Sequence, residues 1–163
     1  NDVVIEENES LTNIDGLSNV TGRSLRLDIS HNMSLPNIDG LSGLSDIDGM
    51  LLDSNPLLRN VDGLANVTQS HHEVTIRNNR SLENLDGLSN VTELGSGLSI
   101  RDNPLLTNLE GLRNLDDFRD TLRIVNNASL PTCAVEHLES RLRSLGWRGD
   151  IVNTGNDDTV SCE

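Results

Sequence analysis

The chain has 163 residues and a formal net charge of −14, and all twelve of its basic residues are Arg. This acidic balance argues against nucleic acid as a partner, and no apolar run approaches the roughly 18 residues that a membrane-spanning helix needs. The only aromatic residues are Phe118 and Trp147, so we expect a core of stacked aliphatic side chains.

One pattern repeats along the chain every 24 residues. "NPLLRNVDGL" (55–64) and "NPLLTNLEGL" (103–112) lie 48 residues apart, with "NRSLENLDGL" (79–88) midway. A column of Asn fixes the register: Asn8, Asn32, Asn55, Asn79, Asn103 and Asn127. A period of this length is typical of a solenoid, in which each unit buries its apolar side against its neighbours. The step from Asn32 to Asn55 is one residue shorter, which we expect a loop near residues 47–50 to absorb.

Each repeat contains a predicted strand of the form apolar-x-apolar-x-x-Asn, from Val3/Ile5/Asn8 to Leu122/Ile124/Asn127. Alternation directs the apolar side chains inward and the residues between and after them outward. The Asn ends the strand, where its amide is placed to hydrogen-bond the backbone of adjacent coils. The Asn column is therefore predicted to be a structural ladder.

An acidic residue followed by Gly comes next in five repeats, from Asp15-Gly16 to Glu110-Gly111. We expect a turn here in which Gly adopts a positive φ. Two interpretations of the aligned carboxylates stay open. They accept turn N–H bonds, or they bind calcium ions that bridge the coils.

The outward strand positions separate by charge along the chain. Acidic side chains come first, and Arg follows: Glu6, Asp28 and Asp53, then Arg77, Arg101 and Arg123. Because the planar fork of Arg pairs bidentately with carboxylates, we predict that this face binds a ligand through these residues. The alternative is that the rows form ion pairs between neighbouring strands, or mutually tolerated like charges, within the face.

The repeat pattern ends after Leu130. Apolar residues then recur at helical intervals between Pro131 and Gly146, which predicts a capping helix near 133–145. Cys133 and Cys162 flank this cap, and two cysteines allow only one pairing, so we expect an extracellular disulfide. No cap precedes Val3, so the N-terminal end is expected to meet an upstream domain or another molecule.

No set of residues indicates catalysis. Neither Ser nor Cys stands in a nucleophile motif, and Gly-rich phosphate loops are absent. The "HHE" at 71–73 is expected to form a surface loop rather than a metal site. We therefore expect no enzymatic activity, no cofactor and no bound metal.

Three segments carry a family resemblance: "LDISHNMSLPNIDGL", "LSIRDNPLLTNLEGL" and "LRIVNNASL" resemble the receptor L domain, a leucine-rich-repeat-like family. The ending "LPTCAVEHL", followed by Trp147 and Cys162, is similar to the cysteine-closed cap of bacterial cell-surface members. The resemblance covers residues 3 to 162 and implies a right-handed β-helix. It also implies recognition or adhesion at a cell surface.

These observations predict one mainly β domain over residues 1–163, a right-handed parallel β-solenoid of the L-domain type. About six 24-residue coils occupy 1–127, and a cap with a helix and a disulfide occupies 128–163. The expected function is extracellular recognition or adhesion, with a protein or glycan bound on the sheet face. A structural cell-envelope protein is the alternative. Ice binding is less favoured, because Thr75 is the only Thr at the outward strand positions.

Overall fold

The computed structural model describes residues 2–21, 25–160 and 162. Residues 1, 22–24, 161 and 163, which the predicted domain includes, lie outside this part. The described chain is mainly β, with a ten-stranded sheet whose strand pairs are parallel and one C-terminal helix. Within it, no helix is long and apolar enough to cross a membrane.

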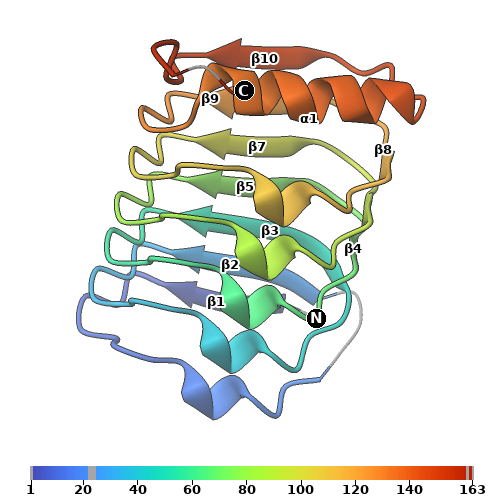
Figure 1. Ribbon diagram of the computed structural model, residues 1–163. Helices are drawn as coiled ribbons and strands as arrows, with labels where there is room; N and C mark the ends of the chain where they lie inside the picture. Colours follow the sequence, from blue (N-terminus) through green and yellow to red (C-terminus); the bar gives the residue numbers. More distant parts are fainter. Residues whose placement is uncertain (1, 22–24, 161, 163) are drawn as a thin grey trace.

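The longer strands stack in chain order along the molecule (Figure 1). They are β1 (Asp2–Glu6), β2 (Leu25–Ser30), β3 (Ile47–Asp53), β5 (Val74–Arg77), β7 (Leu98–Arg101), β9 (Leu122–Val125) and β10 (Ile151–Thr154). From β1 to β9, each of these strands pairs with the one a repeat later, and equivalent residues lie side by side: Leu52 lies beside Ile76, and Ile76 beside Ile100. β1 pairs with β2 alone among the described strands. The expected contact of this N-terminal end with an upstream domain or another molecule stays a prediction.

A second row of two-residue strands extends the sheet: β4 (Gln69–Ser70), β6 (Glu93–Leu94) and β8 (Asp117–Phe118). β3 belongs to both rows, since Ile47 pairs with Ser70 and Met50 with Val74. Only two residues separate Ile47 from Met50, whereas three separate Ser70 from Val74. The prediction that a loop near residues 47–50 absorbs the missing residue is therefore wrong. The missing residue removes a bend and makes β3 one continuous strand.

The predicted alternation of inward apolar residues is confirmed. In the third repeat, Met50, Leu52, Leu58, Val61 and Leu64 are at most 4% exposed. Burial of such a side chain stabilises the fold by about 1.5–3 kcal/mol. Because equivalent residues of adjacent repeats join one cluster, each repeat completes the core of the next.

The acidic-Gly pairs open short 3₁₀ helices, at Asp15–Leu17, Asp39–Leu41, Asp62–Leu64, Asp86–Leu88 and Glu110–Leu112. The predicted positive φ at these glycines is wrong, because the positive-φ glycines of the described chain are Gly146 and Gly155. A Cβ added at Gly63 or Gly87 would overlap a backbone carbonyl of the preceding repeat. Gly is therefore needed for close approach between successive turns.

The positive φ lies instead at the residue before each ladder Asn. Glu7, His31, Ser54, Asn78, Asp102 and Asn126 all have φ 57°. Four of the six are His, Asn or Asp, which tolerate this conformation better than Glu or Ser. Residue preference therefore favours the left-handed conformation in four repeats, and the position in the repeat imposes it at Glu7 and Ser54.

The C-terminal helix α1 (Thr132–Ser144) lies across the last repeat (Figure 1), within one residue of its predicted bounds. Val135, Leu138 and Leu142 form its buried side. Arg141 donates hydrogen bonds to the carbonyls of Leu112 (2.7 Å) and Leu115 (2.9 Å). The cap thus satisfies backbone acceptors that no further repeat covers.

Trp147 follows the helix and completes the cap. Its side chain is 4% exposed, and its indole nitrogen donates to the carbonyl of Asp120 at 2.8 Å. Its ring centroid lies 5.6 Å from that of Phe118, and the Arg143 guanidinium lies 4.6 Å from its ring. Both aromatic residues of the chain are therefore used in the cap.

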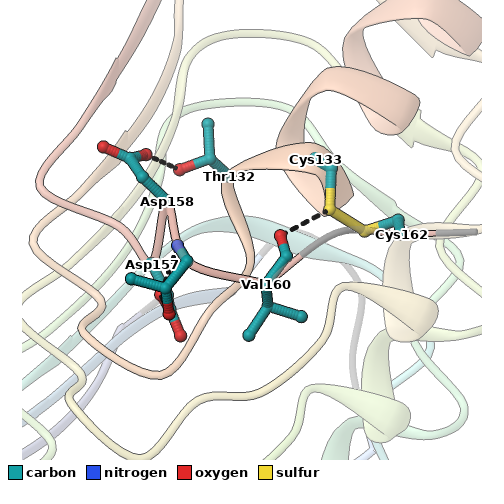
Figure 2. Close-up of a disulfide and its surroundings, with 7 residues drawn as sticks. Thr132, Cys133, Asp157, Asp158, Val160 and Cys162 are labelled. Carbon is teal, nitrogen blue, oxygen red and sulfur yellow. Dashed lines mark hydrogen bonds between the residues drawn. A yellow bond between two sulfur atoms is a disulfide. The ribbon is translucent and has the colours of Figure 1, made fainter.

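Cys133 and Cys162 form a disulfide (Figure 2). The carbonyl oxygen of Val160 lies 3.6 Å from the Cys133 sulfur, a van der Waals contact because a disulfide sulfur carries no hydrogen. Thr132 donates a hydrogen bond to Asp158 beside it. Disulfides of this kind are typical of proteins in oxidising compartments.

Reduction of the disulfide is expected to loosen the cap before the central strands. The bond closes a loop between residues 29 apart, for which the chain-entropy model gives a stabilisation of about 3–4 kcal/mol. Amide hydrogen exchange of the reduced and oxidised protein measures this directly, with faster exchange expected in α1 and β10. Equal acceleration in β3 and β5 would contradict it.

Candidate functional site

The Asn column lies inside the stack at the end of each strand. Asn32, Asn55, Asn79, Asn103 and Asn127 are fully buried. The Asn79 amide nitrogen donates to the carbonyls of Leu52 (3.1 Å) and Arg77 (2.9 Å), and its Oδ1 accepts the backbone N–H of Asn55 at 3.0 Å. Each interior rung thus ties together neighbouring repeats and fixes the end of its strand.

The two ends of the ladder differ from its interior. Asn8 is exposed and donates to the carbonyl of Glu6 (2.9 Å) and to Oδ1 of Asn32 (3.1 Å). Asn156 continues the ladder at the other end, where its Oδ1 accepts the backbone N–H of Asn127 at 3.0 Å. The 24-residue period did not predict Asn156 as part of the ladder, because the cap places it 29 residues after Asn127.

An open groove of about 720 Å³ lies on the outward face, over β3, β5, β7 and β9. Arg77, Arg101 and Arg123 all line it, so the structure brings the three predicted Arg side chains together. Glu6, Asp28 and Asp53, the acidic residues predicted for the same site, do not line the groove. The other residues that line it are Arg26, Asp48, Gly49, Met50, Leu51, His72, Glu73, Thr75 and Ser99.

Arg77 is held in an ion pair at the centre of the face. Its Nη2 and Nε lie 2.6 Å and 2.8 Å from Oδ2 of Asp53. Burial opposes ionisation of Asp53, but hydrogen bonds from Asn78, Arg77 and Ser54 outweigh it and hold the pKa of Asp53 below its ordinary value. Asp53 and Arg77 therefore form an ion pair between neighbouring strands within the face, as the alternative to ligand binding predicts.

Arg101 and Arg123 are placed differently. In the described part of the chain, neither has an ion-pair partner. Arg101 lies beside Arg77 in the sheet register, and its Nε is buried without a hydrogen-bond partner among the residues that the structure describes. Like charges on adjacent strands are unfavourable. Two cations are therefore available to an external anion.

The acidic end of the face forms a separate feature. The charge of Asp28, with smaller effects of burial and of Glu7, raises the pKa of Glu6. Ser30 donates a hydrogen bond to Asp28. These carboxylates thus interact mainly with one another and with local donors, away from the groove.

The rim of the groove contains residues that the sequence did not indicate as a site. His72 is exposed, as expected for the 71–73 segment, and its Nδ1 lies 3.0 Å from Oδ1 of Asp48. Glu73 accepts a hydrogen bond from Thr75 at 3.2 Å. The sequence feature that could have indicated these rim residues is the one-residue deletion in the second repeat. It places Asp48 on the strand next to the bend that contains His72 and Glu73.

The carboxylates that open the 3₁₀ helices do not accept the turn N–H bonds. Side-chain oxygens of another Asn column do so: Asn13, Asn37, Asn60, Asn84 and Asn108 accept the N–H two residues ahead, at 3.0–3.4 Å. Burial, and then the charges of Asp39 and Asp86, raise the pKa of Asp62. The first interpretation of this column is therefore wrong. Over residues 2–21, 25–160 and 162, no group of three or more His, Cys, Asp or Glu is placed to hold a metal ion.

We expect Asp62→Asn to stabilise the protein slightly at pH 7, on the order of 1 °C in Tm. A raised pKa in the folded state means that ionised Asp62 opposes folding at neutral pH, and that this effect disappears as pH falls through the folded-state pKa. Thermal unfolding from pH 7 to pH 3 should show the gain shrinking. Asp53→Asn is the control with the opposite sign, because a lowered pKa stabilises the fold above pH 3.8 and the stabilisation is lost below it. A gain that grows on acidification would contradict the prediction.

Comparison of the chain with protein-family models, with curated proteins and with solved structures finds no match.

Proposed function

We propose that the chain is a non-enzymatic recognition module that binds an anionic ligand in the groove over β3, β5, β7 and β9. One observation carries this proposal: Arg101 and Arg123 line the groove from the adjacent strands β7 and β9, and neither has an ion-pair partner among the described residues. A bound anion supplies the missing counter-charge and relieves the repulsion between Arg101 and Arg77.

Arg101 and Arg123 are the ligand-binding residues in this proposal, and Arg77 has a positioning role. The Asp53 carboxylate neutralises Arg77 at 2.6 Å and fixes its guanidinium at the side of Arg101. Removing Arg77 would leave Asp53, which is 5% exposed, without its cation. A variant that lacks all three Arg residues would therefore lose stability as well as binding.

We further infer that the stacked repeats form a right-handed β-solenoid of about six coils, of the receptor L domain type. The one-repeat register between parallel strands, the Asn ladder and the disulfide-closed cap support this inference. Members of that family act at cell surfaces, and an extracellular or cell-surface location fits the disulfide.

The test compares Arg101→Gln/Arg123→Gln with Arg59→Gln/Arg113→Gln. Both double variants remove two exposed or half-exposed cations, but Arg59 and Arg113 do not line the groove. Binding to a glycan and protein array, and to intact cells, is measured at low and physiological salt. We expect the groove variant to lose binding at least about tenfold without a fall in Tm, because the change also removes the repulsion between Arg101 and Arg77. The control is expected to retain binding.

Retention of all binding by the folded groove variant would contradict the proposal. An absence of any ligand would favour a structural cell-envelope role. In that case Arg101→Gln is expected to change only stability.

A further inference from the structure

The groove carries charges of both signs, and its carboxylates already have neighbours: Asp48 contacts His72, and Glu73 accepts a hydrogen bond from Thr75. Arg26, Arg101 and Arg123 line it without an ion-pair partner among the described residues, and Asp53 neutralises Arg77. Asp48 and Glu73 supply carboxylates on the same groove. A ligand with many negative charges would place some of them against Asp48 and Glu73. A ligand whose anionic groups are spaced by neutral, hydroxyl-bearing segments fits this balance better.

The carboxylates lie on one side of the groove, where Arg26 of β2 is beside them, and two guanidinium groups without ion-pair partners lie on the other side. The guanidinium groups of Arg101 and Arg123 come from β7 and β9 and can only donate. The carboxylates of Asp48 and Glu73 come from β3 and the bend before β5 and, when ionised, can only accept. A ligand that matches both sides carries a carboxylate at one end and hydroxyl donors at the other.

The floor of the groove is poorly suited to an extended peptide. β5 and β7 are hydrogen-bonded to strands on both edges, so no backbone edge is free for an added strand. Met50 is 4% exposed, so the half-buried Leu51 is the main apolar side chain that the groove offers to a peptide. Charge and hydroxyl contacts are therefore the main means of recognition.

A neutral sugar also lacks its usual means of binding here. Aromatic rings present a flat apolar face, but Phe118 of β8 and Trp147 of the cap are only 3% and 4% exposed and do not line the groove. An uncharged ring would therefore bind through hydroxyls alone. These hydroxyls would leave Arg101 without a counter-charge.

We infer that the ligand is an acidic sugar with one carboxylate and several hydroxyls per unit, of the hexuronic acid class. Arg101 and Arg123 bind the carboxylate, and Glu73 and Asp48 accept hydrogen bonds from the hydroxyls. This inference rests on the proposed function and names the ligand class of the same groove.

The experiment titrates the protein by calorimetry with four probes at about 150 mM NaCl. They are a tetramer of hexuronic acid, the same tetramer with its carboxyls reduced to alcohols, a tetramer of glutamate, and a heavily sulfated oligosaccharide. We expect the uronic acid tetramer to bind at least about tenfold more tightly than the other three. Tighter binding of the glutamate or sulfated probe, or equal binding of the reduced tetramer, would overturn the inference.

Glu73→Gln gives a second readout whose sign separates the ligand classes. Loss of a charge-assisted hydrogen bond to a hydroxyl weakens binding of the uronic acid tetramer, by about threefold or more. Longer-range repulsion is largely screened at this salt concentration, where the Debye length is about 8 Å. A peptide or a sulfated ligand would instead place an anionic group directly against Glu73. For these ligands the same variant removes that repulsion and strengthens binding. Glu83→Gln, an exposed position that does not line the groove, is the matched control.

Failure of this inference is distinguishable from failure of the proposed function. If Arg101→Gln/Arg123→Gln abolishes binding of a glutamate or sulfated probe, the groove is an anion site for another ligand class. If no probe binds, and the double variant changes no interaction on the array or on cells, both proposals are wrong.

Discussion

Gly87→Ala is expected to lower the free energy of unfolding by about 3 kcal/mol or more, whereas Gly16→Ala leaves it unchanged or slightly higher. A Cβ at Gly87 would overlap the carbonyl group of Val61 in the preceding repeat. Relief of that overlap requires the two repeats to separate, which also weakens the core and the ladder between them. Gly16 belongs to the first repeat and has nothing within 4 Å of its added Cβ.

The pair is informative because both changes are chemically identical. Replacing Gly by Ala reduces the freedom of the unfolded chain, which by itself stabilises a protein by about 0.4–1 kcal/mol. Urea denaturation followed by circular dichroism measures both variants. Equal effects at the two positions would show that the glycines are required for a reason other than contact with the preceding repeat.

Asn79→Ala is the second change with a large expected effect, about 3 kcal/mol or more. It removes two donated hydrogen bonds and two accepted ones, from Asn55 N (3.0 Å) and Asn55 Nδ2 (3.4 Å). The backbone N–H of Asn55 then lies buried without its acceptor. Asn8→Ala, at the exposed first rung, is expected to cost less than about 1 kcal/mol.

Hydrogen exchange separates the loss of a rung from general destabilisation. The amide of Asn55 donates to the lost side chain, so its protection should fall more than that of amides in β7 or β9. A similar stability loss for Asn79→Ala and Asn8→Ala would contradict the assigned role of the ladder. Unchanged protection at Asn55 would contradict it as well.

Much of the strand arrangement could be predicted, because periodic apolar residues determine which side chains face inward. The pairs Leu52–Ile76 and Ile76–Ile100 follow from the spacing alone. The role of Gly63 and Gly87 could not be predicted, since a glycine in a sequence does not distinguish a positive φ from close packing. The left-handed positions gave only a partial signal, because four of them hold His, Asn or Asp but Glu7 and Ser54 have no preference for that conformation.

The site was predictable as a column of Arg but not as a groove. Charge order along the repeats placed Arg77, Arg101 and Arg123 on adjacent strands. Which of them is neutralised depends on side-chain reach between strands, and among these three Arg residues Arg77 alone lies beside an acidic residue, Asp53, in the register of the described strands. The rim residues Asp48 and Glu73 depend on the bend geometry that the deletion in the second repeat alters.

The uniform contacts between repeats make the length of the molecule adjustable in whole units. A duplicate of residues 79–102 presents to its neighbours the same Asn, the same left-handed residue and the same Gly as the original. Each inserted unit would lengthen the stack by one strand spacing, about 4.8 Å, and add another Arg in line with Arg101. The reach of the groove is therefore a property that copying of a single segment can change, while the cap and its disulfide stay as they are.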